Sequence, residues 1–414
     1  AMDVNIQEKV KKYHPKLESI LGRLAEKYSQ NKVGMQNFAQ QRGISYEDDQ
    51  VRVILVSSPG EDASVIDKVA LISCGAVIEA VYGNLMRVRV PISRLEEIAD
   101  KVKGISYIRL PYRPLSDMGG ERSRLNVLNF LKGSANTLPQ ISSGVISEGV
   151  ELSGASDYHS SGYKGQNTKV AVIDVGFENL SYSKNHGELP KKIIYKDFAT
   201  IKPKNEFVHG TGVAEIVYDM APQTLLYLCR VGDEIDLGYA KDWCIQENVD
   251  IINHSWLWPN TGFADGEGLV CDIANDARAH NILWVNAVGN LARHHYQDVF
   301  TDSNGNGWHE FSPISGDENN TFHHGGGELH IYLTWDCWPT TDEDYDLYLY
   351  DSSSNLLDYS NTRQSGTQPP TEQIVLDDLP AGDYYIKVKK YSASKDHQIK
   401  IICWSYTPLS LIHI

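Results

Sequence analysis

The chain has 414 residues, 41% hydrophobic and 22% charged, a composition that excludes a disordered, collagen-like or coiled-coil protein. Its 54 acidic and 38 basic residues give a formal net charge of −16, which argues against binding to nucleic acid or an anionic membrane surface, because phosphate binding depends on clustered Lys and Arg. No apolar run reaches the ~18 residues of a membrane span, and six cysteines are too few for a disulfide scaffold.

The first part of the chain predicts a helical segment and then a small α+β domain. Apolar residues at helical spacing over 5–30 predict a helix within an N-terminal segment, 1–45. Within the next domain, 46–115, strands and helices are predicted in the order strand, helix, strand, strand, helix, strand, at 51–57, 62–73, 76–81, 84–90, 92–102 and 105–110. This is the order of a ferredoxin-like unit. Residues 116–144 are weakly patterned and predict a linker.

Residues 145–318 predict an α/β domain with a parallel sheet. Helices are expected from Gly210 onward, over 236–247 and over 268–280. The apolar runs that predict strands lie at 168–174, 191–198, 225–231, 249–255 and 282–289. Nearly continuous apolar strands that alternate with helices indicate a sheet buried on both faces.

The C-terminal part, 319–408, predicts an antiparallel β-sandwich or jelly roll, because short alternating strands are separated by Gly, Pro, Ser and Asp. Cys337 and Cys403 both lie in it, so a disulfide and two free thiols are alternatives. The last six residues, 409–414, match the translation of a sequencing-library adapter, so we expect a non-native tail and a gene that continues past 408. The chain does not begin with Met, so the lack of a visible signal peptide leaves its location open.

Three polar residues are predicted at the carboxyl edge of the parallel sheet, where open α/β folds place their sites. Asp174 ends the strand VAVID, His209 begins the helix HGTGVAEI, and Asn290 follows the strand WVNAVG. An Asp orients a His, the His takes a proton from a nucleophile, and an Asn amide donates to an oxyanion. Three of the four parts of a serine hydrolase site are therefore present, in the order Asp, His, Asn.

These motifs, together with HGTGVAEIVYDMAP and the strand VDIINHSW, resemble those of subtilisin-like serine proteases, the subtilases, over about residues 145–295. The resemblance implies a secreted endopeptidase with Asp174 and His209 as catalytic residues and Asn290 in the oxyanion hole. It also implies that Asn253, Ser255 and Trp256 line the substrate cleft, although Trp256 is equally compatible with a core position.

The resemblance extends beyond the α/β domain. It implies that 46–115 is a propeptide that inhibits the enzyme intramolecularly, and that 319–408 is a pre-peptidase-type β-sandwich inserted ahead of the catalytic serine. The partners it implies are a polypeptide substrate and the chain's own propeptide, with no nucleic acid and no membrane span.

The catalytic serine motif of the family, Gly-Thr-Ser-x-Ala-x-Pro, is missing after Asn290, and Ser255 belongs to the substrate-cleft strand instead. Either the gene continues to the serine, or the protein is a catalytically dead relative that binds peptides or a polymer. In both cases this chain lacks the attacking oxygen and is expected to be inactive as written. A non-proteolytic α/β-hydrolase is excluded because no GxSxG elbow is present.

One metal site is predicted by sequence. Asp302, Asn304 and Asn306 place oxygen ligands at alternating positions before Gly307, as in the first half of a calcium loop. The twelfth position is Pro313 where a Glu is expected, so a plain Asx-rich turn is the alternative. Ca²⁺ is the only cofactor that we expect.

Overall fold

A computed structural model describes residues 10–115, 145–200, 207–289, 291, 294–312 and 314–404. The chain divides into two compact units, each made of more than one segment. Unit 1 comprises residues 1–111, 259–268 and 291–414, and unit 2 comprises residues 112–258 and 269–290. The expected linker 116–144 and tail 409–414 lie outside the described residues.

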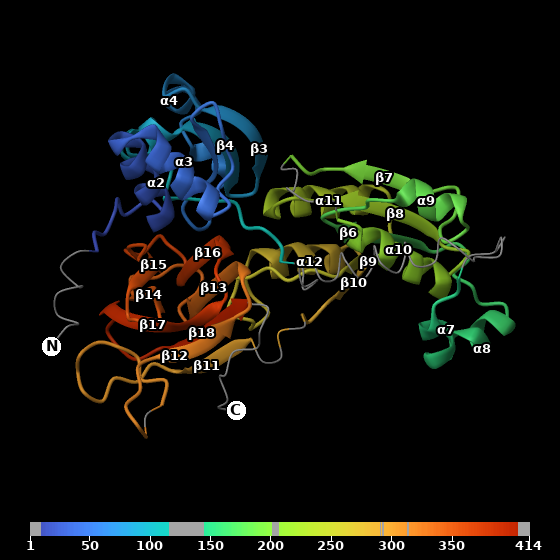
Figure 1. The fold of residues 1–414 in the computed structure, drawn as a ribbon. Coiled ribbons are helices and arrows are strands. Elements are labelled where there is room, and N and C mark those ends of the chain that lie inside the picture. Colours follow the sequence, from blue (N-terminus) through green and yellow to red (C-terminus); the bar gives the residue numbers. More distant parts are fainter. Residues whose placement is uncertain are drawn as a thin grey trace. The chain divides into compact units, whose positions relative to one another are not determined.

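The first part of unit 1 is an α+β domain, which we call the N-terminal domain (residues 10–111) (Figure 1). Its elements are α2 (Ser19–Gln30), α3 (Lys32–Gln41), β1 (Tyr46–Glu47), β2 (Gln50–Val56), η1 (Ala63–Val65), α4 (Lys68–Ser73), β3 (Val77–Tyr82), β4 (Leu85–Pro91), η2 (Ile92–Arg94), α5 (Leu95–Lys101) and β5 (Tyr107–Arg109). The sheet is antiparallel, with β4 between β2 and β3 and with β1 and β5 on the other edge of β2. The predicted order of strands and helices is therefore present, and its apolar faces enclose one core.

The helix expected over 5–30 begins at Ser19 within the described residues. The segment just before it lies along β5 instead: Ile108 N–H donates to Lys16 O at 2.7 Å, and Glu18 N–H donates to Ile108 O at 2.9 Å. This pairing uses backbone groups that a longer helix would need for its own hydrogen bonds.

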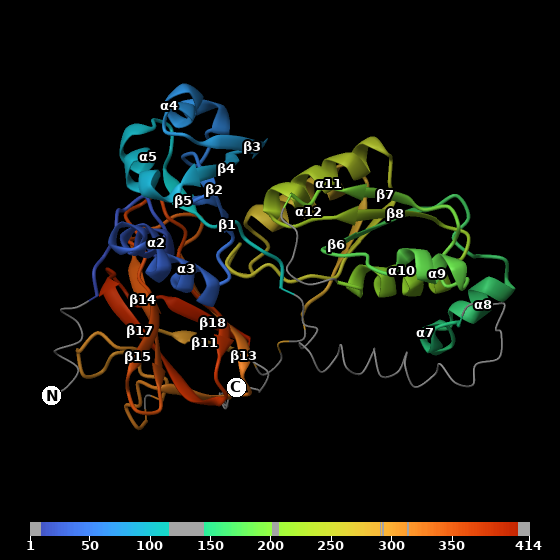
Figure 2. The same cartoon turned by 45° about the horizontal axis from the view of Figure 1, so that its top comes forward.

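Unit 2 contains a five-stranded parallel sheet in the order β10-β9-β6-β8-β7. Helices α11 and α12 cover one face of it and helices α9 and α10 the other (Figure 2). The elements are α7 (Glu148–Leu152), α8 (Ala155–Ser160), β6 (Lys169–Asp174), α9 (Leu180–Asn185), β7 (Ile194–Asp197), α10 (His209–Met220), β8 (Leu225–Arg230), α11 (Glu234–Gln246), β9 (Ile251–His254), α12 (Leu269–Ala279) and β10 (Leu283–Asn286).

The strands of this sheet differ in burial according to their position. The central strand β6 is buried from Val170 to Asp174, as expected for a strand with helices on both faces. The edge strand β10 leaves Leu283 60% and Val285 46% exposed. The predicted parallel sheet is confirmed, and its centre carries the candidate site.

The remaining part of unit 1 is a sandwich of two four-stranded antiparallel sheets, ordered β11-β18-β13-β16 and β12-β17-β14-β15. The strands are β11 (His295–Val299), β12 (Asn320–His324), β13 (Gly327–Trp335), β14 (Asp344–Asp351), β15 (Leu356–Ser360), β16 (Thr371–Leu379), β17 (Gly382–Ser392) and β18 (Gln398–Trp404). Strand β11 lies before residue 319, where the sequence placed the start of the sandwich. It pairs with β18 over five residues, so the sandwich takes in the chain from His295 onward.

The sandwich core is rich in aromatic side chains, with Trp335 and Tyr345 fully buried. Cys337 and Cys403 are free thiols, which decides against the disulfide alternative. Among the described helices, none is both long and apolar enough to cross a membrane.

Candidate active site

Asp174 occupies the carboxyl end of β6 and is fully buried. Its Oδ1 accepts hydrogen bonds from the backbone N–H groups of Val175 at 2.8 Å and Gly176 at 3.3 Å. Its own carbonyl accepts from Val231 N–H at 2.9 Å, just past β8. These bonds fix the carboxylate so that Oδ2 is left for another partner.

That partner is His209, the first residue of α10, whose Nδ1–H donates to Asp174 Oδ2 at 2.7 Å. Two glycines allow α10 to start this close to the strand end. A Cβ on Gly210 would lie 2.5 Å from Gly176 O and 2.8 Å from Asp174 Cβ, and a Cβ on Gly176 would lie 2.5 Å from Phe207 Cβ. Close packing therefore requires a glycine at position 210 but not at position 212, because a Cβ on Gly212 would meet nothing within 4 Å.

The hydrogen bond to Asp174 raises the pKa of His209 above its usual value, against the opposing effect of partial burial. The ring remains 22% exposed, and its Nε2 has no hydrogen-bond partner among the residues that the structure describes. With Nδ1 protonated and held by a carboxylate, Nε2 is the basic nitrogen. The pair is therefore built to accept a proton at Nε2 and to stabilise the resulting imidazolium.

Trp256 packs against the ring of His209 from a buried position. It is 3% exposed, and its ring meets the His209 ring edge to face with centroids 5.4 Å apart. Its Nε1–H is buried without a hydrogen-bond partner among the described residues. Trp256 is therefore both a core residue and a wall of the site.

Asn253 and Ser255 lie on and just after β9, beside the Asp174 strand, because Val172 and Asn253 are register partners. Asn253 Nδ2 donates to Ser255 Oγ at 3.0 Å. Within the described part of the chain, neither side chain hydrogen-bonds to His209 or Asp174. Their role in a substrate cleft stays a prediction.

His254, between them in sequence, is a site residue that the sequence analysis did not identify. It is fully buried, its Nδ1 bonds to Ile173 O at 2.9 Å, and its Nε2 accepts from Trp258 Nε1–H at 2.8 Å. Burial lowers the pKa of His254, and its bond to Ile173 O links β9 to β6 one residue before Asp174. No sequence signal distinguishes it from an ordinary polar residue at a strand end.

A short antiparallel backbone pairing lies just beyond Trp256 and was also not predicted. Leu115 N–H donates to Leu257 O at 2.8 Å, and Leu257 N–H donates to Leu115 O at 3.4 Å. Leu115 follows the N-terminal domain in the chain, and a Cβ on Gly289 would lie 3.9 Å from Leu257 Cδ2. An extended polypeptide segment thus pairs with the chain that leads out of β9.

Asn290 lies outside the described residues, so its oxyanion role stays a prediction. The described chain brings together the Asp and the His of the expected site.

The candidate calcium loop is closed on itself. The Asp302 carboxylate accepts from the backbone N–H groups of Asn306 at 3.0 Å and Gly307 at 2.8 Å, and Asn304 Oδ1 accepts from Asn306 N–H at 3.0 Å. The amide groups of Asn304 and Asn306 both donate to Glu318. Among the described residues, no group of three or more His, Cys, Asp or Glu has the arrangement of a metal site. Calcium binding by Asp302, Asn304 and Asn306 stays an untested prediction, and the geometry fits the Asx-rich turn.

Comparison with known proteins finds similarity to subtilisins. No family model matches the chain. Over 149 residues it is 29% identical to Subtilisin from Bacillus pumilus, covering 32% of this chain and 50% of that relative. It is equally identical to Subtilisin E from Bacillus subtilis (strain 168), covering 36% of that protein. The chain thus spans half or less of these curated relatives.

Among solved structures, a lanthipeptide protease matches with a TM-score of 0.26 and 22% identity, over 33% of this chain and 43% of that one. That score is too low to support an argument. The chain is distantly related to subtilisins over about a third of its length.

Proposed function

We propose that the chain is part of a secreted serine endopeptidase of the subtilisin type, in its proform. The observation that carries the proposal is the 2.7 Å bond between His209 Nδ1 and the fully buried Asp174, at the carboxyl edge of a parallel sheet. The distant relationship to subtilisins over about a third of the chain supports the same chemistry.

In the proposed mechanism, His209 Nε2 takes the proton of a serine hydroxyl as its oxygen attacks the carbonyl carbon of a peptide bond. Asp174 holds the ring in the Nδ1–H tautomer and stabilises the imidazolium. The Asn290 amide donates to the oxyanion of the tetrahedral intermediate. When that intermediate collapses and the C–N bond breaks, the imidazolium returns the proton to the leaving amine.

No serine of this chain after Asn290 lies in the family's serine motif. We propose that continuing coding sequence supplies the nucleophilic serine. The 414-residue chain by itself should then show no covalent catalysis, because the Asp–His pair has no hydroxyl to activate.

The pairing of Leu115 with Leu257 supports a polypeptide ligand for the same site. Adding an extended strand to exposed backbone groups is a general mode of peptide recognition. Because Leu115 directly follows the N-terminal domain, we propose that this domain inhibits the enzyme by placing its own chain where a substrate would pair.

The same pairing favours a second candidate function, a catalytically dead relative that binds peptides. Backbone pairing at Leu257 requires no serine, so it would persist in a protein without catalysis.

The decisive test is to sequence the source DNA outward from codon 400 and to express the extended product. Under the protease proposal, a fluorophosphonate probe labels the extended protein at one serine, and His209→Ala abolishes the labelling. The 414-residue chain stays unlabelled. Stoichiometric labelling of that chain, or a genuine stop codon after Ile414, would refute the proposal as stated.

The peptide-binding candidate is tested by fluorescence anisotropy with a labelled peptide that spans residues 108–118. Leu115→Pro removes the N–H that donates to Leu257, so the peptide gains access to the Leu257 backbone. Adding Leu257→Pro should abolish binding, because it removes the second N–H donor. Leu257→Ala is the matched control and keeps the backbone donor, so it should bind. Equal binding by both Leu257 variants would exclude backbone pairing.

A further inference from the structure

The N-terminal domain and the sandwich belong to the same compact unit, and basic side chains of the first meet acidic side chains of the second. Lys12 Nζ donates to Asp344 Oδ1 at 2.8 Å and to Asp346 Oδ1 at 2.7 Å. The Lys12 side chain is 13% exposed and both carboxylates are 2% exposed. The Lys12 ammonium also lies 4.0 Å from the centre of the Tyr391 ring, a cation–π distance.

A second cluster repeats this arrangement at Asp358 on β15. Arg23 Nη2 bonds to Asp358 Oδ1 at 2.6 Å, and Arg42 Nε donates to Asp358 Oδ2 at 3.1 Å. Arg23 also donates to Tyr359 O at 2.6 Å, with its guanidinium over the Tyr359 ring. Each oxygen of the buried Asp358 carboxylate thus bonds to one cation, Arg23 of α2 or Arg42, which follows α3.

Further hydrogen bonds continue the same contact. Ser19 N–H donates to Thr362 Oγ1 at 3.1 Å, and Gln368 Nε2 donates to Pro15 O at 2.6 Å. Glu18 accepts from Gln373 Nε2 at 2.6 Å. Backbone and side-chain groups at the start of α2 therefore find partners on the sandwich.

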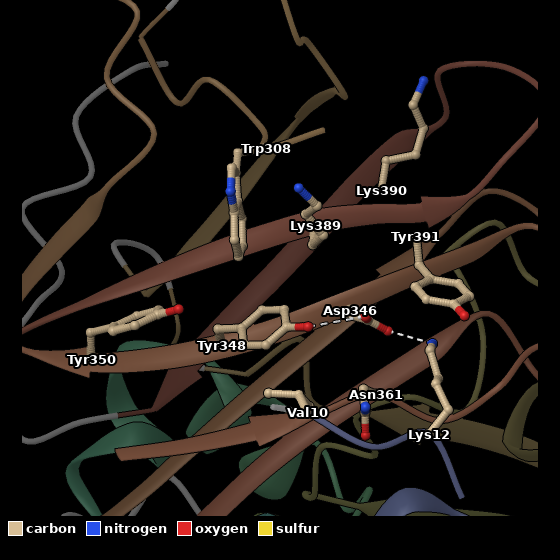
Figure 3. A pocket seen from close by; sticks show the side chains of 10 residues that line it. All are labelled: Val10, Lys12, Trp308, Asp346, Tyr348, Tyr350, Asn361, Lys389, Lys390 and Tyr391. Atoms are coloured by element: carbon tan, nitrogen blue, oxygen red, sulfur yellow. Dashed lines mark hydrogen bonds and ion pairs between the residues drawn. The ribbon is translucent and has the colours of Figure 1, made fainter. Parts of the chain in front are cut away.

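The N-terminal segment also closes one side of a cavity of about 230 Å³ on the sandwich. Val10 and Lys12 line it from the N-terminal side, opposite Trp308 (Figure 3). The figure shows Lys12 reaching Asp346, which also accepts from Tyr348 Oη–H at 3.1 Å. Removing the segment would open this cavity and expose two adjacent carboxylates.

We propose that the sandwich is the receptor for the N-terminal domain and holds it non-covalently, so that cutting the connector alone does not release it. Buried carboxylates that are each paired with a cation make the contact specific. If either the cation or the carboxylate is buried without the other, it remains a desolvated, unpaired charge. This proposal goes beyond the proposed function, since it requires no catalysis. It assigns to the sandwich control over when the inhibitory domain leaves.

The test uses the full chain with a recognition sequence for a site-specific protease inserted between residues 116 and 144. After cutting, size-exclusion chromatography and native mass spectrometry at micromolar concentration should show the N-terminal fragment still bound. The double variant Arg23→Ala/Arg42→Ala should weaken retention roughly a hundredfold, because it removes both cationic partners of the buried Asp358 carboxylate. Arg94→Ala is the matched control, since Arg94 is an exposed arginine of the same domain that pairs with its neighbour Glu97.

The fragment also carries Leu115, so the variants decide which contact retains it. If the wild-type fragment separates on cutting, or if the double variant is retained as tightly as the wild type, the proposal is wrong. Lys12→Met covers the case in which the double variant does not fold, because Lys12 lies before α2 and outside the domain core. It should weaken retention at least tenfold, and unchanged retention would likewise overturn the proposal. Because an added protease makes the cut, the result does not depend on whether the protein is itself an enzyme.

Discussion

In unit 1 the Asp358 carboxylate is 2% exposed and receives two guanidinium groups, whereas in unit 2 the equally buried Asp174 holds a histidine ring that stays 22% exposed. Both sites pair a buried acid with a cationic or basic partner. The difference is that the ring of His209 leaves Nε2 without a hydrogen-bond partner among the described residues, whereas the Arg23 and Arg42 side chains are themselves buried against Asp358. We call the cluster of Asp358, Arg23 and Arg42 the sealed pair and Asp174 with His209 the open pair. A sealed pair supports structure and docking, and an open pair supports proton transfer.

Breaking the sealed pair should have the largest effect. Asp358→Asn leaves the Arg23 and Arg42 guanidinium groups buried without a counter-charge, which should cost about 3–5 kcal/mol of the free energy of unfolding of unit 1. Urea denaturation followed by tryptophan fluorescence measures it. Glu97→Gln removes a partly exposed acid that pairs with the exposed Arg94 and Lys101 and should change the urea midpoint little. Equal effects of the two substitutions would show that burial of the pair is not decisive.

Unit 1 should also lose stability on acidification through His309, another sealed group. Its Nδ1 accepts from Thr301 N–H at 3.0 Å, its Nε2 bonds to Tyr296 Oη at 2.8 Å, and burial lowers the pKa of His309 to about 4. The unfolded chain therefore takes up a proton at this ring more readily than the folded chain, and stability is lost as pH falls from about 6.5 to about 4, by about 3 kcal/mol. Denaturation at a series of pH values measures the slope, which His309→Gln should reduce. An unchanged slope in that variant would assign the loss to other groups.

At the open pair, two glycines of α10 provide a matched comparison. Gly210→Ala should destabilise unit 2 by about 1–3 kcal/mol, because its Cβ would collide with Gly176 O and force α10 away from β6. Gly212→Ala meets nothing within 4 Å and should stabilise the helix by about 0.5–1 kcal/mol. Thermal unfolding of both variants measures the difference. Destabilisation by both would mean that the close approach at Gly210 is not the cause.

The smallest structural change should alter only the titration of His209. Asp174→Asn keeps an oxygen for the Val175 and Gly176 N–H groups but removes the charge that raises the pKa of His209, so this pKa should fall. The stability that the pair contributes is present below about pH 6.5 and is lost as pH rises through the folded-state pKa. Histidine Cε1–H resonances in an NMR titration report the midpoint. A midpoint that does not fall would show that Asp174 is not its main determinant.

Most regular elements could be predicted from sequence, because their patterns are local. The central strand β6 is apolar throughout, and β16 alternates between buried and half-buried residues. Asp174 and His209 were found because their motifs sit at element ends, which the parallel topology brings to one edge. The short strand β11 escaped prediction, because its sequence, HYQDV, has little apolar alternation and depends on β18 for its pairing.

The charged contacts of unit 1 could not be predicted for a related reason. Lys12 and Asp344 lie 332 positions apart, and nothing local marks either residue as a partner rather than a solvated surface charge. His254 was missed because its two hydrogen bonds appear only after β9 pairs with β6. The pairing of Leu115 with Leu257 uses backbone groups alone, which leave no trace in side-chain patterns.

Unit 1 consists of chain segments that the ribosome makes at different times, because unit 2 lies between them in the sequence. Unit 2 ends near residue 290, whereas unit 1 needs strands up to β18, which ends at Trp404. Domains generally fold as units while the chain emerges, and residues 112–258 and 269–290 of unit 2 are all made before β18 of unit 1. The N-terminal domain must wait with Lys12, Arg23 and Arg42 unpaired until more than three hundred further residues have been made. Completion of the sandwich strands thus decides when the N-terminal domain finds its partner.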